Sequence, residues 1–111
     1  MISLKITKKK IKQLAKREAN KLMKEWSNAV KDRDKRICVI CKDAKMLNAH
    51  HIIPRENAKL RYDINNGISL CPKHHQFSRD ISAHSNSFIF YVWLQENRLE
   101  QFNYIKQSVN R

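Results

Sequence analysis

The stretch "NNGISLCPKHH" (residues 65–75) combines a turn, a short apolar segment and three side chains of the types that bind metals, Cys71, His74 and His75. Its first three residues are typical of turns, and Gly67 is the only glycine in the chain. The apolar character of residues 68–70 predicts a short strand. Pro72 suits the first turn of a helix over Lys73–Arg79, where its missing N–H costs no hydrogen bond. The stretch therefore predicts a turn, a strand and a helix in that order.

Cys71 and His74 repeat the spacing of an earlier pair, Cys38 and Cys41 in "CVIC". Each pair can bring two ligands to one ion because the chain turns back within a few residues, and four such ligands suit tetrahedral zinc. Four ligands close the coordination shell, so we expect a structural zinc whose binding contributes to folding, about 10–16 kcal/mol in zinc-finger peptides. The alternative is a set of buried free thiols with a redox-active Cys38–Cys41 dithiol.

A second group of histidines lies beside this predicted zinc site. His50 and His51 occur in "AHHIIP", and His75 directly follows His74. Neighbouring side chains point to opposite faces of a strand and differ by about 100° on a helix. We therefore expect His50 and His75 to share a divalent cation at an open site. His51 would then be free to take a proton from water, and a cation beside such a base suits phosphodiester hydrolysis.

Two further residues are candidates for this site. The amide of Asn66 could hold the loop that carries His51, or orient a carbonyl group beside that imidazole. His84 could be a third ligand of the cation if the helix ends near Asp80 and the chain folds back. The alternative for His84 is a surface or helix-capping role.

Three basic residues flank the histidine pair and could contact phosphates; equally, they could be solvated loop residues. They are Arg55, Lys59 and Arg61.

Together, "CVIC", "AHHIIP" and "NNGISLCPKHH" resemble the HNH endonuclease family over about residues 37–84. The resemblance implies a ββα-metal fold and a metal-dependent DNA endonuclease that uses one metal ion. It implies that His51 is the general base, that Asn66 is the asparagine of the motif, and that His50 and His75 hold the catalytic metal. The helix after Pro72 would then lie against the minor groove of DNA.

The chain departs from the common family pattern at two positions. Many members have Asp where His50 stands and Cys where His74 stands. Both residues found here can still bind a metal, so the departures do not argue against activity. The expected cofactors are a structural Zn²⁺ and a catalytic Mg²⁺ or Mn²⁺, with Ni²⁺ or Zn²⁺ as alternatives.

The predicted fold class is α+β, with a small ββα-metal core stabilised by zinc, a long basic N-terminal helix and C-terminal helices. We expect a single domain, residues 1–111, with a basic helical extension (1–36), the zinc and ββα-metal core (37–84) and a helical C-terminal part (85–111). Additional strand pieces are expected at 37–40 and 52–53.

Periodicity supports three helices. Apolar residues recur at helical spacing over about residues 8–31, at Ile11, Leu14, Ala15, Ala19, Leu22, Trp26 and Val30. A second helix, capped by Asn86 or Ser87, would contain Phe88, Tyr91, Val92 and Gln95, and a third over about 97–108 would present Leu99, Phe102 and Ile105. We expect the aromatic residues to belong to the core rather than to a base-stacking surface.

Charge predicts a polyanionic partner. The chain has 23 Lys and Arg against 10 Asp and Glu, a net charge of +13, and the first 36 residues hold thirteen of these cations and four of the acids. Double-stranded DNA is the expected partner; an anionic membrane surface or an ordinary solvated basic helix would also explain the charge. The longest apolar cluster, Phe88–Leu94, falls short of the roughly 18 residues that span a bilayer, so no membrane is expected.

The odd number of cysteines, three, argues against a disulfide framework. We therefore expect the protein in a reducing cytoplasm, that of a bacterium or a phage-infected host. A phage nuclease fits the small size, and a homodimer or a phage protein partner stays open. The alternative function is a non-catalytic, zinc-stabilised DNA-binding module. His50, His51, Asn66 and His75 argue against this alternative because a purely structural zinc fold needs none of them.

Overall fold

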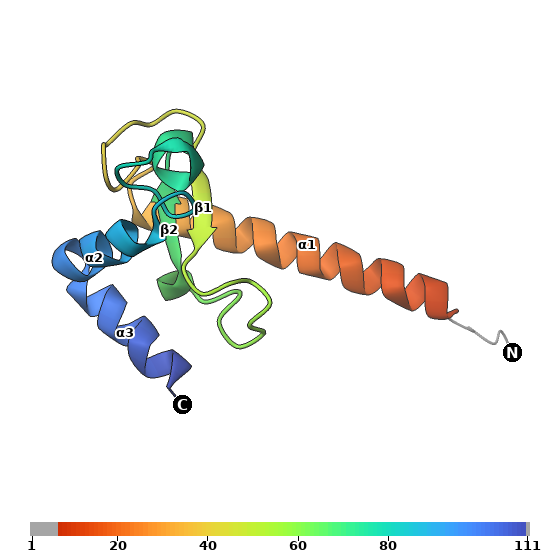
Figure 1. Ribbon diagram of the computed structural model, residues 1–111. Coiled ribbons are helices and arrows are strands. Elements are labelled where there is room, and N and C mark those ends of the chain that lie inside the picture. Colours follow the sequence, from red (N-terminus) through yellow and green to blue (C-terminus); the bar gives the residue numbers. More distant parts are fainter. Residues whose placement is uncertain (1–6, 111) are drawn as a thin grey trace, which may run out of the picture.

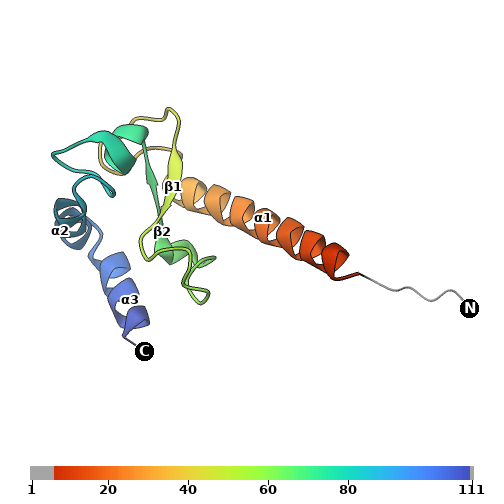
Figure 2. The same cartoon turned by 45° about the vertical axis from the view of Figure 1, so that its right-hand side comes forward.

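The structure, a computed structural model, describes residues 7–110, and its fold class is α+β, as the sequence predicted. A two-stranded antiparallel sheet lies between the C-terminal end of one long helix and a pair of shorter helices (Figures 1 and 2). The elements are α1 (Lys8–Arg33), β1 (Asn48–His51), the 3₁₀ turn η1 (Ile64–Asn66), β2 (Gly67–Leu70), the π-helical turn η2 (Lys73–Phe77), α2 (Ser87–Asn97) and α3 (Leu99–Val109).

The sheet forms the centre of the core. In its register His50 pairs with Ile68 and His51 with Gly67. Every residue of β2 is buried, since α1 packs on the sheet from one side and the C-terminal helices pack from the other. Phe90, Leu94 and Ile105 supply the helical part of this core. The predicted strand over 68–70 is thus confirmed, and it begins one residue earlier.

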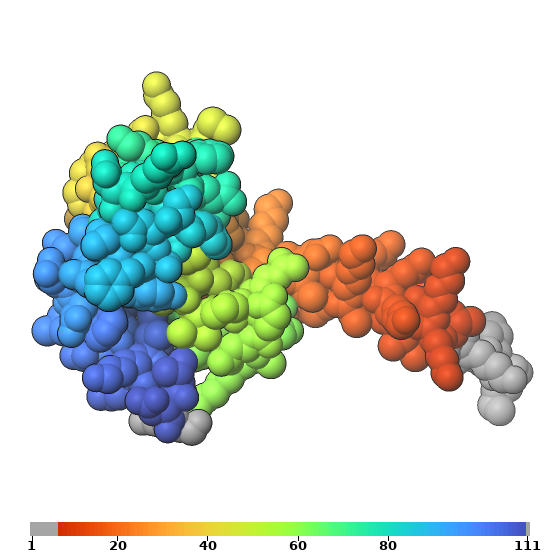
Figure 3. Space-filling model, viewed as in Figure 1, coloured from red at the N-terminus to blue at the C-terminus, as the bar shows by residue number. Residues whose placement is uncertain are grey.

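Only the second half of α1 packs against the rest of the protein. Trp26 and Val30 are its buried residues, whereas residues 7–21 are exposed on all sides. Ile11 and Leu14, which the periodicity assigned to an apolar face, are 54% and 45% exposed. The helix itself is confirmed over 8–33, but its first turns project away from the core, because no described segment of the chain covers them (Figures 1 and 3).

Two strand predictions were wrong. Residues 38–41 form a turn in which the Lys42 N–H donates to the Cys38 carbonyl at 2.8 Å, since two ligands separated by two residues require a reversal. Residues 52–53 follow β1 as a bend, and the histidine pair lies in the strand itself. The predicted helix over Lys73–Arg79 ends at Phe77, where the Ser78 N–H donates to the Lys73 carbonyl.

The two C-terminal helices are confirmed, and Asn86 caps α2 by accepting from the Ile89 N–H. The expected core role of the aromatic residues holds for Phe90 but not for Phe88, which is 73% exposed. Tyr91 and Leu99 are also exposed. The difference arises because the buried face of α2 runs through Phe90 and Leu94, one turn apart, rather than through Phe88 and Tyr91.

A buried carboxylate ties α1, β2 and the α2–α3 junction together. The side chain of Asp34 is 2% exposed and accepts hydrogen bonds from Arg33, from Arg98 at 3.0 Å and from the Ser69 N–H at 2.9 Å. Burial alone would raise the pKa of Asp34, but the hydrogen bonds from Arg33 and Ser69 and the charges of both guanidinium groups outweigh it and lower that pKa. Asp34 is therefore an ionised cross-link between the three elements.

Within the part of the chain that the structure describes, each helix is too short or too polar to cross a bilayer.

Replacing Gly67 with alanine should destabilise the fold. A Cβ at Gly67 would lie 2.3 Å from Val30 Cγ2 and 2.6 Å from Trp26 Cζ2, so the helix would have to move off the strand. The φ of Gly67 is −127°, which alanine adopts freely, so the cost is steric. We expect a loss of about 1–3 kcal/mol in the free energy of unfolding, measured by denaturant titration. The double variant Gly67→Ala/Val30→Ala should be less destabilised than the two single losses combined; unchanged stability of Gly67→Ala would contradict this packing.

Candidate metal centres and catalytic cleft

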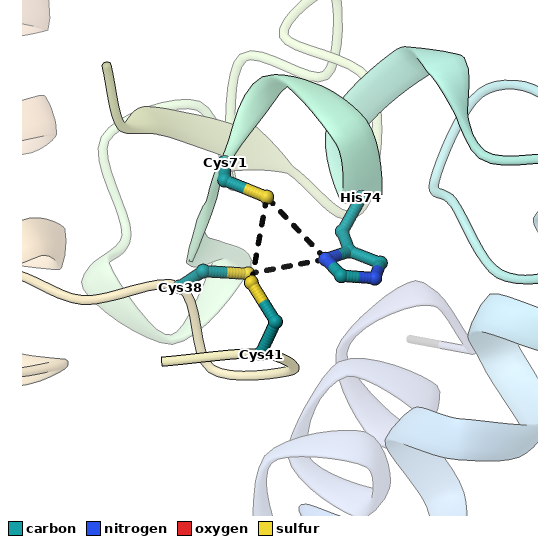
Figure 4. Close-up of side chains that lie close together, drawn as sticks. All are labelled: Cys38, Cys41, Cys71 and His74. Carbon is teal, nitrogen blue, oxygen red and sulfur yellow. Dashed lines mark hydrogen bonds between the residues drawn. The ribbon is translucent and has the colours of Figure 1, made fainter. Parts of the chain in front are cut away.

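Four metal-binding side chains converge where two turns face each other. Cys38 and Cys41 come from the turn after α1, Cys71 directly follows β2, and His74 lies on η2 (Figure 4). Cys38 Sγ lies 3.7 Å from His74 Nδ1, Cys41 Sγ lies 3.7 Å from Cys71 Sγ, and Cys71 Sγ lies 3.3 Å from His74 Nδ1. The structure thus brings together the four residues predicted for a structural zinc.

These distances fit a tetrahedral ion. With Zn–S bonds of about 2.3 Å, the edges of the coordination tetrahedron are about 3.8 Å. Burial would raise the pKa of the Cys38 thiol, but N–H groups of Cys41, Cys71 and Ile40 point at its sulfur and lower that pKa. Burial raises the pKa of Cys71 to about 11, with Cys38 and Cys41 adding to the effect. A divalent cation would offset the repulsion between three thiolates, so this Cys₃His cluster could bind a metal such as zinc.

A second cluster holds three imidazoles. Donor atoms of His50, His75 and His84 all lie within 4.8 Å of one another, and the Nε2 atoms of His75 and His84 are 3.1 Å apart. His50 comes from β1 and His75 from η2. The chain folds back after η2, and the His84 N–H donates to the His75 carbonyl at 3.0 Å, which places the third ring.

The single turn η2 separates the two clusters. His74 and His75 are adjacent, yet one faces the cysteines and the other faces the imidazoles. The turn is π-helical, a form found frequently at functional sites. It is held by the His75 N–H, which donates to the Cys71 carbonyl at 2.8 Å, and by the Ala83 N–H, which donates to the His74 carbonyl.

The three imidazoles suit a divalent cation. Burial, joined by the charges of the neighbouring histidines, lowers the pKa of His50 to about 3. Burial and the charge of His84 also lower the pKa of His75. Both rings are therefore neutral at physiological pH, as metal ligation requires. The cluster lines an open cleft of about 450 Å³.

His51 lines the same cleft but points to the opposite face of β1 from His50, as strand alternation predicts. Its Nε2 lies 2.9 Å from the Arg61 carbonyl oxygen. A carbonyl can only accept, so Nε2 carries the proton and Nδ1 of the neutral ring is left with a lone pair. Burial lowers the pKa of His51, partly opposed by the bond to the Arg61 carbonyl. The ring is therefore neutral and able to take a proton at neutral pH.

Asn66 is fully buried and holds the loop between the strands. Its Oδ1 accepts from the Ile53 N–H at 2.7 Å, and its Nδ2 donates to the carbonyls of Ile53 at 2.9 Å and Leu60 at 3.2 Å. The Leu60 carbonyl directly precedes Arg61, whose carbonyl meets His51. The Asn66 side chain thus links residues 53 and 60 of this loop.

The three flanking basic residues lie in different places. Arg55 lines the histidine cleft and also a second cleft, beside Ala19 and Met23 of α1. Arg61 lines only the second of these, and its Nε donates to the Arg55 carbonyl at 3.0 Å. Lys59 lies on the α3 side of the loop, in a small cavity with Tyr104. Arg55 is therefore the member of the trio that lines the histidine cleft.

Two residues at the cleft were not predicted as site residues. Trp26 stacks on the imidazole of His51, and Tyr91 lines the cleft with its hydroxyl donating to the Ile52 carbonyl at 3.2 Å. The sequence assigned Trp26 to the apolar face of a helix and Tyr91 to the core. The sequence pattern around Trp26 or Tyr91 does not indicate which residue its side chain contacts, because both contacts join residues far apart in the chain.

Loss of a cysteine-cluster ligand and loss of His51 should have different effects on the stability of the protein. Cys41→Ser removes a thiolate ligand, so the variant should lose stoichiometric zinc and melt far below the wild-type protein or aggregate. His51→Ala leaves the four ligands in place and should stay folded and zinc-loaded. Metal analysis and circular dichroism melting would check both variants. Similar melting curves for the two would contradict this division.

One comparison with known proteins agrees with the resemblance seen in the sequence. The model of the HNH endonuclease family matches residues 38–79, which span all four cysteine-cluster residues together with His50, His51, Asn66 and His75. Neither the curated proteins nor the solved structures contain a match to the chain. The family match therefore confirms the predicted resemblance of this segment to HNH endonucleases.

Proposed function

We propose that this protein is a metal-dependent endonuclease that hydrolyses phosphodiester bonds of double-stranded DNA with one catalytic cation and His51 as general base. The proposal is carried by one observation: three clustered imidazoles line the same open cleft as a fourth, His51, whose Nε2 carries the proton and whose Nδ1 keeps a lone pair. The match to the HNH endonuclease family supports it.

His50, His75 and His84 would hold the cation. When bound, a divalent cation steadies charge on the phosphorus and on the leaving oxygen. The protein's own part begins with His51, whose Nδ1 takes a proton from the attacking water. The Arg61 carbonyl keeps its hydrogen bond to Nε2 throughout and favours the imidazolium that forms. Arg55, at the same cleft, would donate to a phosphate oxygen and so fix the scissile group beside His51.

The basic face of α1 would supply affinity for the duplex. Eight Lys and Arg residues against one Glu lie between residues 8 and 24, on a part of the helix that is exposed apart from residues 22 and 23. The cleft lined by Ala19, Met23 and Arg55 borders this helix, and Arg55 also lines the histidine cleft. The sugar–phosphate backbone of a duplex bound to α1 would therefore lie near the histidines of the cleft. Phosphate contacts of this kind carry little sequence information, so we expect weak sequence preference.

The alternative, a DNA-binding module without catalysis, would use the Cys₃His cluster and α1 alone. It leaves unexplained why three further imidazoles meet in a cleft beside a separately held fourth.

A plasmid-nicking assay tests the proposal. With Mg²⁺ or Mn²⁺, and with Ni²⁺ or Zn²⁺ in parallel, wild-type protein should relax supercoiled plasmid. His51→Ala should be slower by roughly 100-fold or more, because a positioned general base contributes about that factor. Lys106→Ala, a change of an exposed lysine on α3, is the matched control and should keep wild-type activity. The interpretation as an enzyme would be contradicted if the wild type and His51→Ala left supercoiled plasmid equally intact with every metal.

Salt dependence tests the role given to α1. Affinity for duplex DNA should fall steeply between low and moderate salt because binding releases counterions. The triple variant Lys9→Gln/Lys12→Gln/Lys16→Gln should bind more weakly and reduce the slope of log K against log salt by up to about 3, roughly one for each phosphate that is no longer neutralised. Fluorescence anisotropy would measure both, with Lys106→Gln as the control. A flat salt response of the wild type would remove α1 from the binding surface.

A further inference from the structure

We propose that Trp26 of α1 is a positioning residue for His51, holding the plane of the imidazole so that Nδ1 faces the attacking water. This inference rests on the proposed function. It assigns a role within the reaction to a residue that lies outside the segment matched by the family model, residues 38–79.

The contact is a parallel stack. The ring centroids of Trp26 and His51 are 3.8 Å apart and the ring planes differ by 9°. Trp26 covers one face of the imidazole and is itself 4% exposed. One face of the His51 ring is therefore closed by the indole, and the ring lines the histidine cleft.

Trp26 is itself held firmly. Its Nε1–H donates to the Asp63 carbonyl at 2.7 Å. Its six-membered ring packs on Gly67, the cross-strand partner of His51, at a distance that a side chain there would forbid. Asp63 belongs to the same loop as Arg61, so this loop supplies one carbonyl to the indole and another to the imidazole. The two rings are thus placed by one common support.

The hydrogen bond to Arg61 alone would not fix the ring. The outer torsion of a histidine side chain has broad minima, and a single hydrogen bond allows the imidazole to pivot about the line from Nε2 to its acceptor. Such a pivot would swing the plane of the ring, and with it the direction of the Nδ1 lone pair. A flat indole at 3.8 Å blocks this motion because the imidazole edge would collide with it. The hydrogen bond and the stack therefore restrain different motions of the same ring.

Turnover kinetics test the role. Trp26→Leu keeps an apolar side chain but removes the flat face, so kcat for plasmid nicking should fall about 10–100-fold, the cost typical of a misplaced catalytic group, with KM for DNA within about threefold. Trp26→Phe retains a flat ring and should recover most of kcat, although it lacks the Nε1–H. Val30→Ala, a change of a buried residue one turn further along α1, is the control for lost packing and should keep kcat within about threefold at a temperature where each variant is folded and zinc-loaded.

Proton NMR of the imidazole separates this inference from the proposed function. The ring protons of His51 should be shifted upfield by the indole in the wild type and in His50→Ala, and the shift should disappear in Trp26→Leu. Absence of the shift in the wild type, kcat of Trp26→Leu within threefold of wild type, or an equal loss of kcat in Val30→Ala would each overturn the role of Trp26. A wild-type protein with the upfield shift but without nicking activity would instead refute the proposed function, and with it any catalytic role of the stack.

Discussion

The convergence of three thiols and one imidazole on a single point is the constraint on which the rest of the structure depends. The sheet has only two strands of four residues each, and a hairpin of that size is marginal in water. The Cys₃His cluster joins the turn after α1 to the turn after β2, so it closes the segment that contains both strands. A metal bound there would stabilise the fold by linking these two turns, which the small apolar core leaves weakly connected.

Pairs of adjacent histidines let this small core serve two purposes. His74 faces the sulfur atoms while His75 faces the cleft, and His50 joins the imidazole cluster while His51 turns to Trp26. In each pair the local backbone conformation fixes the directions of both side chains, because neighbouring residues on a strand or a turn diverge by a set angle. Any shift of η2 relative to β1 would therefore disturb the cysteine cluster and the histidine cleft together. The stability of the first and the geometry of the second are coupled through a few residues of backbone.

The sequence allowed much of this arrangement to be predicted because the decisive signals are local. The spacing of Cys38–Cys41 and of Cys71–His74 defines a closed ligand set, and strand alternation separates His50 from His51 whatever the details of the fold. The errors have the same origin: "CVIC" has apolar, β-branched residues typical of a strand, but the need to place two ligands on one point makes it a turn. The Trp26 stack and the Asp34 cross-link were invisible because both join residues more than 20 positions apart, and periodicity reports only which face of a helix is apolar.

The exposed half of α1 links stability to the proposed activity. Isolated helices are marginal in water, and like charges along one helix repel each other, so this lysine-rich segment has little in its own sequence to hold it beyond the Thr7 cap. Its rigidity comes from the C-terminal half of α1, where Trp26 packs on Gly67. A polyanion along the segment would relieve this repulsion and so stabilise the helix. Because Trp26 also stacks on His51, the same anchor that supports the DNA-binding arm fixes the ring proposed to activate water, and substrate binding and catalysis would then depend on one shared contact.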